Sequence, residues 1–262
     1  MTDRLSRSAD PAGGAPTRTL HRGLRVLELL AEQAGDSGLG VSEVAAAAGL
    51  DKATALRLLQ TLGTLGYAYR DPETKAYRLT GKLLGLSESF RSNLEVPRRI
   101  RPFLTRLRDE TGQTVHFGVR EGNRVVYILK LESNSPVLIA SAIGQSMPVN
   151  TTSLGKAMLA AMSDAEYERV LAELDFERRT ERSFTDPRAF RQEIDRTRER
   201  GFAVDDRENE SSITCVGSAL VDGTGAVVGA ISVAGPSYVI ESRVDEFGRL
   251  CRDTAMTIRA LL

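Results

Sequence analysis

The chain has 262 residues, in which 35 lysines and arginines balance 35 aspartates and glutamates, and 41% of the residues are hydrophobic. This is the composition of a globular protein long enough for two domains, and it lacks the run of about 18 to 20 apolar residues that a membrane span needs. Two cysteines and two histidines exclude a disulfide framework and a histidine-rich metal centre, so we expect a cytoplasmic protein without metal or cofactor.

The net charge of zero conceals a difference between the two ends of the chain. Residues 1–108 carry 17 lysines and arginines against 11 aspartates and glutamates, a net charge of +6, and residues 109–262 carry 18 against 24, a net charge of −6. The first part can therefore approach a polyanion such as DNA, although a solvated surface would carry a similar excess.

The N-terminal region begins with an irregular segment and continues with a helix. Residues 1–17 are rich in Pro, Gly, Ala and Ser without an apolar period, which predicts a disordered arm. Apolar residues at helical spacing start at Leu20, and the pattern stops at the Gly, Asp and Ser residues of positions 35–38.

Two further helices follow, separated by a tight turn. The first is expected over residues 43–48, with Ser42 as its N-cap and Gly49 at its end, and the second from its N-cap Asp51 to Leu65. The predicted buried stripe of the second helix consists of Ala53, Leu56, Leu58, Leu59, Leu62 and Leu65. This arrangement is typical of a helix-turn-helix, whose second helix fits the major groove of DNA.

A two-stranded hairpin after the second helix predicts a wing, because aromatic and apolar residues alternate with polar ones on both sides of the turn at residues 71–74. We expect base contacts from the second helix and phosphate contacts from the wing. The predicted DNA-binding residues are Lys52, Thr54, Arg57, Thr61, Arg70 and Lys75. The alternative is a small helical bundle with a solvated hairpin. The winged helix-turn-helix domain is expected over residues 18–80.

A linker helix is expected over residues 81–96, with a break near Pro97, and a second domain over residues 97–262. The arginines of residues 98–108 fit a solvated face at a subunit junction better than minor contacts to the DNA backbone. The second domain reads as α+β, with strands at 115–120, 124–131, 137–143, 213–221 and 227–234 and helices at 163–174, 187–201 and 244–262. This architecture occurs both in sensor domains and in enzymes.

Signals for catalysis are weak. The segment Gly155-Lys156-Ala157 lacks the glycine spacing and the hydroxyl residue of a phosphate-binding loop. Nothing in the sequence brings Cys215 and His116 together as nucleophile and base. We therefore expect no enzyme. Two alternatives are an enzyme with an accessory DNA-binding module, which would turn its ligand over, and an architectural nucleoid protein, which would bind DNA without sequence preference.

Seven segments in order resemble the IclR-type transcriptional regulators over residues 18–262. They are LHRGLRVL (20–27), VSEVAAAAGLDKATALRLLQTLGTLGY (41–67), YRLTGKLLGL (77–86), MPVNTTSLGKAMLA (147–160), GFAVDDREN (201–209), ITCVGSALVD (213–222) and GAISVAGP (229–236). The resemblance implies a winged helix-turn-helix domain, a linker helix and a GAF-like effector-binding domain. It also implies a homodimer or homotetramer that binds a partly palindromic operator and responds to a small-molecule effector.

The resemblance further implies a site for small carboxylates. Family members that bind such acids use residues that match Ser153, Leu154, Gly155, Asp205, Cys215 and Ser232 here. Amides at a helix start attract an anion, whereas Asp205 beside an anion needs a proton, a water or a ligand hydroxyl. Where those members have a second serine this chain has Ala234, which argues against glyoxylate-like or pyruvate-like effectors and leaves a bulkier or more apolar acid open. The residues Ile139, Ile143 and Met147 line an apolar wall or belong to the core.

Overall fold

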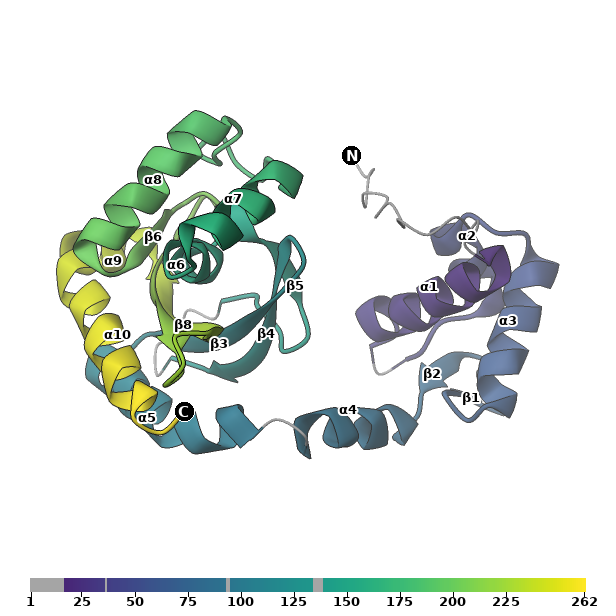
Figure 1. Cartoon of the computed structure of the whole chain (residues 1–262). Helices are drawn as coiled ribbons and strands as arrows, with labels where there is room; N and C mark the ends of the chain where they lie inside the picture. The colour runs from purple at the N-terminus through teal and green to yellow at the C-terminus, as the bar shows by residue number, and fades with distance from the viewer. Residues whose placement is uncertain (1–16, 36, 93–94, 134–138) are drawn as a thin grey trace. The chain divides into compact units, whose positions relative to one another are not determined.

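A computed structural model describes residues 17–35, 37–92, 95–133 and 139–262. The chain divides into two compact units, Met1–Asn93 and Leu94–Leu262, each with its own arrangement of helices and strands (Figure 1). The predicted arm of residues 1–17 lies outside the described residues, apart from Thr17. Within the described ranges, no helix has the length and apolarity needed to cross a bilayer.

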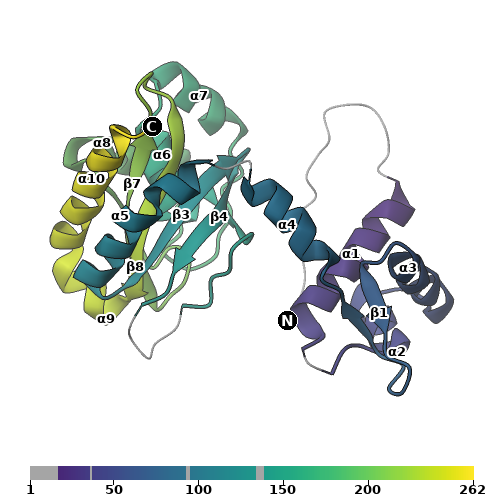
Figure 2. The same cartoon turned by 90° about the horizontal axis from the view of Figure 1, so that it is seen from below.

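The described part of the N-terminal unit begins with three helices and a small hairpin, which Figure 2 shows grouped together. The helices are α1 (Arg18–Gln33), α2 (Val41–Ala48) and α3 (Lys52–Thr64), and the hairpin pairs β1 (Ala68–Arg70) with β2 (Tyr77–Leu79). Apolar side chains from all these elements form one buried cluster, which includes Val26, Leu30, Val44, Ala55, Leu59, Leu62 and Tyr77. Helix α4 (Lys82–Ser92) follows.

The N-cap of α2 differs from the prediction. The helix begins one residue before Ser42, and Gly40 is the N-cap, with its amide donating to the Glu43 carboxylate at 2.7 Å. The Glu43 side chain provides the acceptor, so the cap does not need a hydroxyl at Ser42, which is exposed. The end of α2 agrees with the prediction, since Gly49 has a φ of +63°.

The C-terminal unit contains a six-stranded antiparallel sheet in the order β5-β4-β3-β8-β7-β6. The strands are β3 (Thr114–Glu121), β4 (Arg124–Leu131), β5 (Ser146–Pro148), β6 (Ala203–Asp206), β7 (Ile213–Val221) and β8 (Val227–Pro236). The helices are α5 (Glu95–Thr111), α6 (Ser153–Ala160), α7 (Asp164–Glu173), α8 (Pro187–Arg200), α9 (Ser237–Ile240) and α10 (Val244–Arg259). Two 3-10 turns complete it, η1 (Val149–Thr151) and η2 (Glu241–Arg243). The unit is α+β, as predicted.

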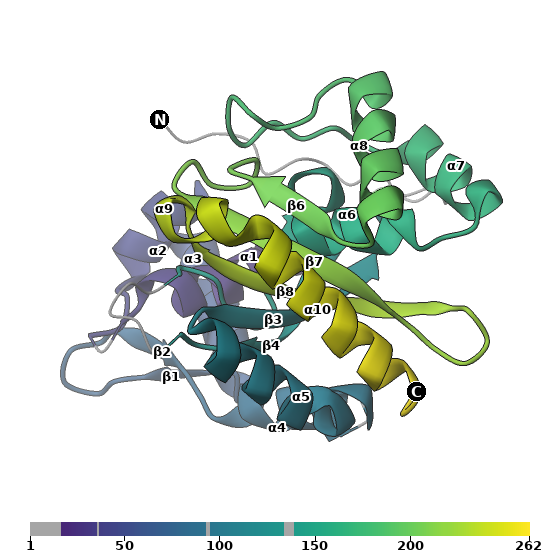
Figure 3. The same ribbon diagram turned by 90° about the vertical axis from the view of Figure 1, so that its left-hand side faces the viewer.

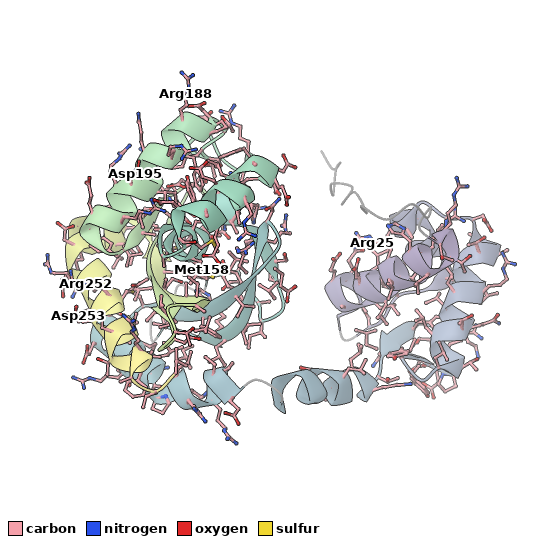
Figure 4. The ribbon with its side chains drawn as sticks, viewed as in Figure 1. Arg25, Met158, Arg188, Asp195, Arg252 and Asp253 are labelled. Carbon is pink, nitrogen blue, oxygen red and sulfur yellow. The ribbon has the colours of Figure 1, made fainter. Side chains whose placement is uncertain are left out.

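Helices cover both faces of this sheet. Helices α5 and α10 lie across one face (Figure 3), where their apolar residues pack with Phe117, Val216 and Ile231. Helices α6, α7 and α8 belong to a second apolar cluster, in which Met158 of α6 points into the interior (Figure 4). Strands β4, β7 and β8 contribute side chains to both clusters, as the alternation of strand side chains requires, whereas the apolar residues of β3 belong to the first cluster.

Two predicted boundaries in this unit differ from the structure. Helix α5 starts at Glu95 and includes Pro97 in its first turn, where a missing amide costs no helical hydrogen bond. The strand predicted over residues 137–143 falls partly outside the described residues, and its described part is irregular and ends in a turn, with the strand β5 following at Ser146. Lys130 holds this irregular part by donating to the carbonyls of Ile139 and Ser141 at 2.9 and 2.8 Å.

Candidate DNA-binding face and effector pocket

Helix α3 begins where Asp51 caps it, as the sequence predicts. The Asp51 carboxylate accepts from the Thr54 amide at 2.8 Å and from the Thr54 hydroxyl at 2.7 Å. These two hydrogen bonds, the hydroxyl bond first, lower the pKa of Asp51 below its ordinary value. The cap fixes the start of the second helix of the helix-turn-helix, and with it the direction in which each later side chain points.

The buried side of α3 is rotated from the predicted stripe. The buried residues are Ala55, Leu58, Leu59 and Leu62, whereas Ala53 and Leu65 are exposed and Leu56 is half-buried. The prediction is confirmed for Leu58, Leu59 and Leu62. It is wrong for the other three residues because leucines occur all round this helix, so apolarity alone does not define its inner side. The packing of α1 and α2 against α3 selects that side.

The six predicted DNA-binding residues lie at the surface of the N-terminal unit, exposed except for the half-buried Thr54. Lys52 and Arg57 form no hydrogen bond or ion pair with any residue that the structure describes. The threonine hydroxyls are used within the helix, since Thr54 donates to Asp51 and Thr61 donates to the carbonyl of Arg57 at 2.9 Å. The free basic side chains are therefore the strongest candidates for contacts to DNA on α3.

The wing also carries its predicted basic residues. Arg70 donates from Nε to the Lys75 carbonyl at 3.5 Å, and its guanidinium lies 5.8 Å from the centre of the Tyr77 ring. Lys75 has a φ of +60°, and its ammonium donates to the Pro72 carbonyl at 2.5 Å. A phosphate contact by Lys75 would replace this hydrogen bond within the turn.

The register of the second sheet brings the remaining predicted residues together. Asp205 pairs with Cys215, and Cys215 pairs with Ala234, so these three residues form one row across β6, β7 and β8. Ser232 lies in the next row, opposite His116 of β3. Paired residues share one face of a sheet, so Asp205, Cys215 and Ser232 face the same side.

Helix α6 starts above these rows. A Cβ on Gly217 would lie 3.2 Å from Ser153 Oγ, and one on Gly118 would lie 3.1 Å from a methyl of Leu154. Glycines in the sheet therefore let the first turn of α6 approach the strands closely. Gly155 has a different part, because its amide donates to the Thr152 hydroxyl at 3.0 Å and its missing Cβ lets the Val149 carbonyl pack against the helix.

A small cavity of about 20 Å³ lies between α6 and the sheet. Five of the six predicted effector-binding residues line it, namely Ser153, Leu154, Asp205, Cys215 and Ser232, and Gly155 does not. This volume accommodates only one or two water molecules, so an organic ligand must displace side chains to enter. Ile139 and Met147 border the cavity, and Met147 also belongs to the second apolar cluster, whereas Ile143 is exposed and does not border the cavity.

Three hydroxyl groups of the cavity wall have no hydrogen-bond partner among the residues that the structure describes. They belong to Tyr127, Ser153 and Ser232, all of which are buried. The oxygens of Tyr167 and Asn150 are buried without a partner elsewhere in the unit, whereas these three hydroxyls border the cavity and can each bond to water or to a polar ligand there. All three can donate, as can the first amides of α6, and the wall therefore suits an acceptor-rich ligand.

His116, which the sequence suggests only as a catalytic base, also lines the cavity. Its Nε2 lies 2.8 Å from Ser141 Oγ, and its ring stacks on Tyr127 with the ring centres 4.8 Å apart. Burial, followed by the charge of Lys130, lowers the pKa of His116 to about 3. The imidazole is neutral near pH 7, so it offers a hydrogen-bonding group and an aromatic face but no charge. Its position opposite Ser232 depends on strand register, which no local pattern reveals.

Asp205 belongs to a buried network of charges. Its carboxylate accepts from the amides of Glu208 and Asn209 at 2.8 and 3.3 Å, and Glu208 forms a 2.5 Å ion pair with the fully buried Lys156. Burial raises the pKa of Asp205 to about 7, and the Glu208 carboxylate adds to this effect. Burial, followed by the charge of Asp205, likewise raises the pKa of Cys215, which therefore stays a neutral thiol.

A larger open cleft of about 590 Å³ lies along α8 and the turn after β6. Its basic residues are already paired, since Arg182 contacts Asp206, Arg200 contacts Glu193 and Arg207 contacts Glu241. Within the described residues, no three His, Cys, Asp or Glu side chains are grouped as metal ligands. The small cavity, with unpaired hydroxyls and no paired ions across it, is the better candidate for a ligand site.

A helix-turn-helix unit with a hairpin, joined to a separate α+β unit, is the architecture of a DNA-binding transcriptional regulator. Comparison with known families agrees. Residues 19–72 match the IclR helix-turn-helix domain, and residues 89–260 match the family described as bacterial transcriptional regulator IclR C-terminal. The chain belongs to the IclR family of DNA-binding transcriptional regulators.

Individual relatives support this assignment. The chain is 29% identical over 255 residues to the HTH-type transcriptional repressor AllR of Escherichia coli K12, covering 97% of this chain and 93% of AllR. Its fold matches the crystal structure of Thermotoga maritima IclR with a TM-score of 0.78 and 27% identity, covering 93% of this chain and 98% of that one. Because such relatives are regulators and not enzymes, the enzyme alternative is set aside.

A further structure has the same fold with a ligand bound. It is an IclR homologue from Microbacterium hydrocarbonoxydans complexed with 4-hydroxybenzoate. The TM-score is 0.74 at 23% identity, and the match covers 92% of this chain and 98% of that one. At this level of identity the likeness concerns the fold.

Proposed function

We propose that the protein is a one-component regulator in which an organic-acid effector, bound in the C-terminal unit, changes affinity for an operator. It acts in the cytoplasm, where its DNA is, as a homodimer or homotetramer on a partly palindromic operator. Paired winged helices read two half-sites about 34 Å apart, which gives the discrimination that one recognition helix lacks. The effector shifts operator affinity by binding one arrangement of the paired helices better than another.

The observation that carries the effector proposal is the set of unpaired donors around the small cavity. The hydroxyls of Ser153 and Ser232 and the first amides of α6 supply donors to a carboxylate. The proposed effector-binding residues remain Ser153, Leu154, Gly155, Asp205, Cys215 and Ser232. Gly155 has the least support, because the Thr152 hydroxyl already accepts from its amide.

The chemistry of the cavity also favours an acid with an apolar or aromatic body. Ala234 stands beside Cys215 where a second serine would add a hydrogen bond, and Ile139, Met147 and the Tyr127 ring add apolar surface. A thermal-shift screen of the purified protein with small aliphatic and aromatic acids tests this, since a ligand of the native state raises the melting temperature. We include 4-hydroxybenzoate, the ligand of the Microbacterium homologue, in the panel.

Replacing Ser232 by Ala should abolish the response to whichever acid raises the melting temperature, and Cys215→Phe should do the same by filling the cavity. Both side chains are remote in sequence from the winged helix, so operator binding should persist. Titration calorimetry measures the loss of acid binding, and DNA binding is measured on the same samples. Unchanged acid affinity in both variants would remove the effector from this cavity.

For DNA, we propose contacts from Lys52, Thr54, Arg57, Thr61, Arg70 and Lys75. Arg57→Ala should weaken operator binding by roughly 1 to 3 kcal/mol per half-site and relax base preference, because a free arginine in the major groove pairs with guanine. Fluorescence anisotropy with an operator duplex measures both effects. Wild-type affinity in Arg57→Ala would show that α3 does not lie in the groove as proposed.

A further inference from the structure

The buried residues of α3 show which side of the helix is turned away from the core of the N-terminal unit. Ala55, Leu58, Leu59 and Leu62 define the inner side of the helix. Successive residues of an α-helix are rotated by about 100° around its axis. Arg57 and Gln60 therefore each lie within about 30° of the direction opposite to this inner side. The predicted contacts Thr54 and Thr61 lie about 90° and 70° from that direction, at the flanks of the outer face.

The hydrogen bonds of the outer face single out the same two residues. Thr64 also faces outward, but its hydroxyl donates to the Gln60 carbonyl at 3.0 Å, and Ala53 has only a methyl group. Arg57 and Gln60 are exposed, and neither side chain forms a hydrogen bond within the described part of the chain. On the outer face of α3, these two side chains have free hydrogen-bonding groups at their ends.

We propose that Gln60 is a base-reading residue which, together with Arg57, sets the sequence preference of the operator. Glutamine pairs through two hydrogen bonds with N6 and N7 of adenine, and arginine pairs in the same way with O6 and N7 of guanine. The two Cα atoms differ by about 4.5 Å along the helix axis, and successive base pairs are about 3.4 Å apart. Each half-site therefore contains an adenine for Gln60 one or two steps from a guanine for Arg57.

The inference rests on the proposed position of α3 in the major groove, and the experiment separates the two. Full-length protein selects binding sites from a pool of random duplexes, first as wild type and then as Gln60→Ala. We expect the variant to keep the guanine preference and lose the adenine preference at one position per half-site. Binding to the wild-type site should fall by about 5- to 150-fold per half-site, as expected for loss of a bidentate base contact.

Two further variants sharpen the result. Gln60→Glu replaces the amide by an acceptor-only carboxylate, which pairs with the N4 amino group of cytosine, so the preferred base should change from adenine to cytosine at that position. Gln33→Ala is the matched control, because Gln33 is an exposed helical glutamine at the end of α1. It should select the wild-type site with wild-type affinity.

The outcomes are distinct. An unchanged motif and affinity in Gln60→Ala and Gln60→Glu would overturn the role of Gln60 while leaving DNA binding by α3 intact. A wild-type protein that selects no motif would instead contradict the proposed operator recognition itself. Circular dichroism of each variant shows whether the helices are retained, as an exposed position on α3 predicts.

Discussion

Replacing Lys156 by methionine is expected to destabilise the C-terminal unit by about 3 to 5 kcal/mol, because it leaves the Glu208 carboxylate buried without its counter-charge. Lys156 is fully buried, its ammonium lies 2.5 Å from Glu208 Oε1, and it also lies 5.3 Å from the centre of the Phe184 ring. The other oxygen of Glu208 is buried and has no partner among the described residues. Urea unfolding of the full chain, followed by circular dichroism, measures the loss.

Two variants show whether the charge or the lost volume causes this effect. Lys156→Met combined with Glu208→Gln removes both charges, so it should recover most of the stability that the single variant loses. Arg191→Met breaks an exposed ion pair with Glu168, for which we expect a loss of less than about 1 kcal/mol. A Lys156→Met protein as stable as Arg191→Met would contradict the expected cost of an uncompensated buried charge.

The buried ion pair between Lys156 and Glu208 is not evident from the sequence, because local sequence patterns do not show which distant residues come into contact. The sequence predicts an effector contact for Gly155 and excludes a phosphate-binding loop at Gly155-Lys156-Ala157, but it predicts no role for Lys156. This lysine is buried because α6 packs on the sheet and because the turn after β6 brings Glu208 to it, 52 residues further along the chain. Partners this far apart are joined only by the fold.

Features that depend on neighbouring residues were predicted well. Asp51 caps α3 as predicted, and Ser163 and Asp186 cap α7 and α8 in the same way, because an N-cap needs only a short polar side chain within three residues of a free amide. The strands β7 and β8 also agree with their predicted spans within two residues. The family resemblance, supported by seven ordered segments, gave the fold class and the type of regulator.

Predictions that required the direction of a side chain were less accurate. On α3, leucines on several sides hid the inner face, so the predicted stripe includes Ala53, Leu56 and Leu65, which are not buried, and omits Ala55, which is. In the C-terminal unit, the spacing of ten residues between Asp205 and Cys215 came from the resemblance. The antiparallel register of β6 and β7 explains this spacing, because it places the two residues opposite each other. The position of His116 in the cavity wall likewise follows only from strand pairing, which places it opposite Ser232.

Asp205 should make the protein less stable as the pH rises from about 4 to 7. Its pKa is raised in the folded protein from the ordinary value of 3.8 to about 7, mainly by burial and then by Glu208. The folded state therefore holds a proton in this range that the unfolded state has lost, and the stability linked to that proton is lost as the pH passes through the folded pKa. Asp205→Asn cannot titrate, so it should melt at a higher temperature than wild type at pH 8.

The comparison of Asp205→Asn with wild type at two pH values tests this linkage. The gain in melting temperature should be large at pH 8 and small at pH 5, where the wild-type carboxyl is already protonated in the folded state. Asp206→Asn is the control, since Asp206 is a surface partner of Arg182 and Arg207 and should change stability little at either pH. An equal gain at pH 5 and pH 8 would show that Asp205 does not carry the proton.

The same proton bears on the proposed effector, because Asp205 lines the cavity that a carboxylate would enter. The groups around it are Glu208 and Glu210 on its own turn, Cys215 on β7, Lys156 on α6 and, across the cavity, His116 and Tyr127. Lys156 is already paired with Glu208, so a second carboxylate is accommodated best when Asp205 is protonated. Acid binding to wild type should weaken above about pH 7, whereas binding to Asp205→Asn should not. Calorimetry at pH 6 and pH 8 measures both, and a parallel loss in the two proteins would assign the pH dependence to another group.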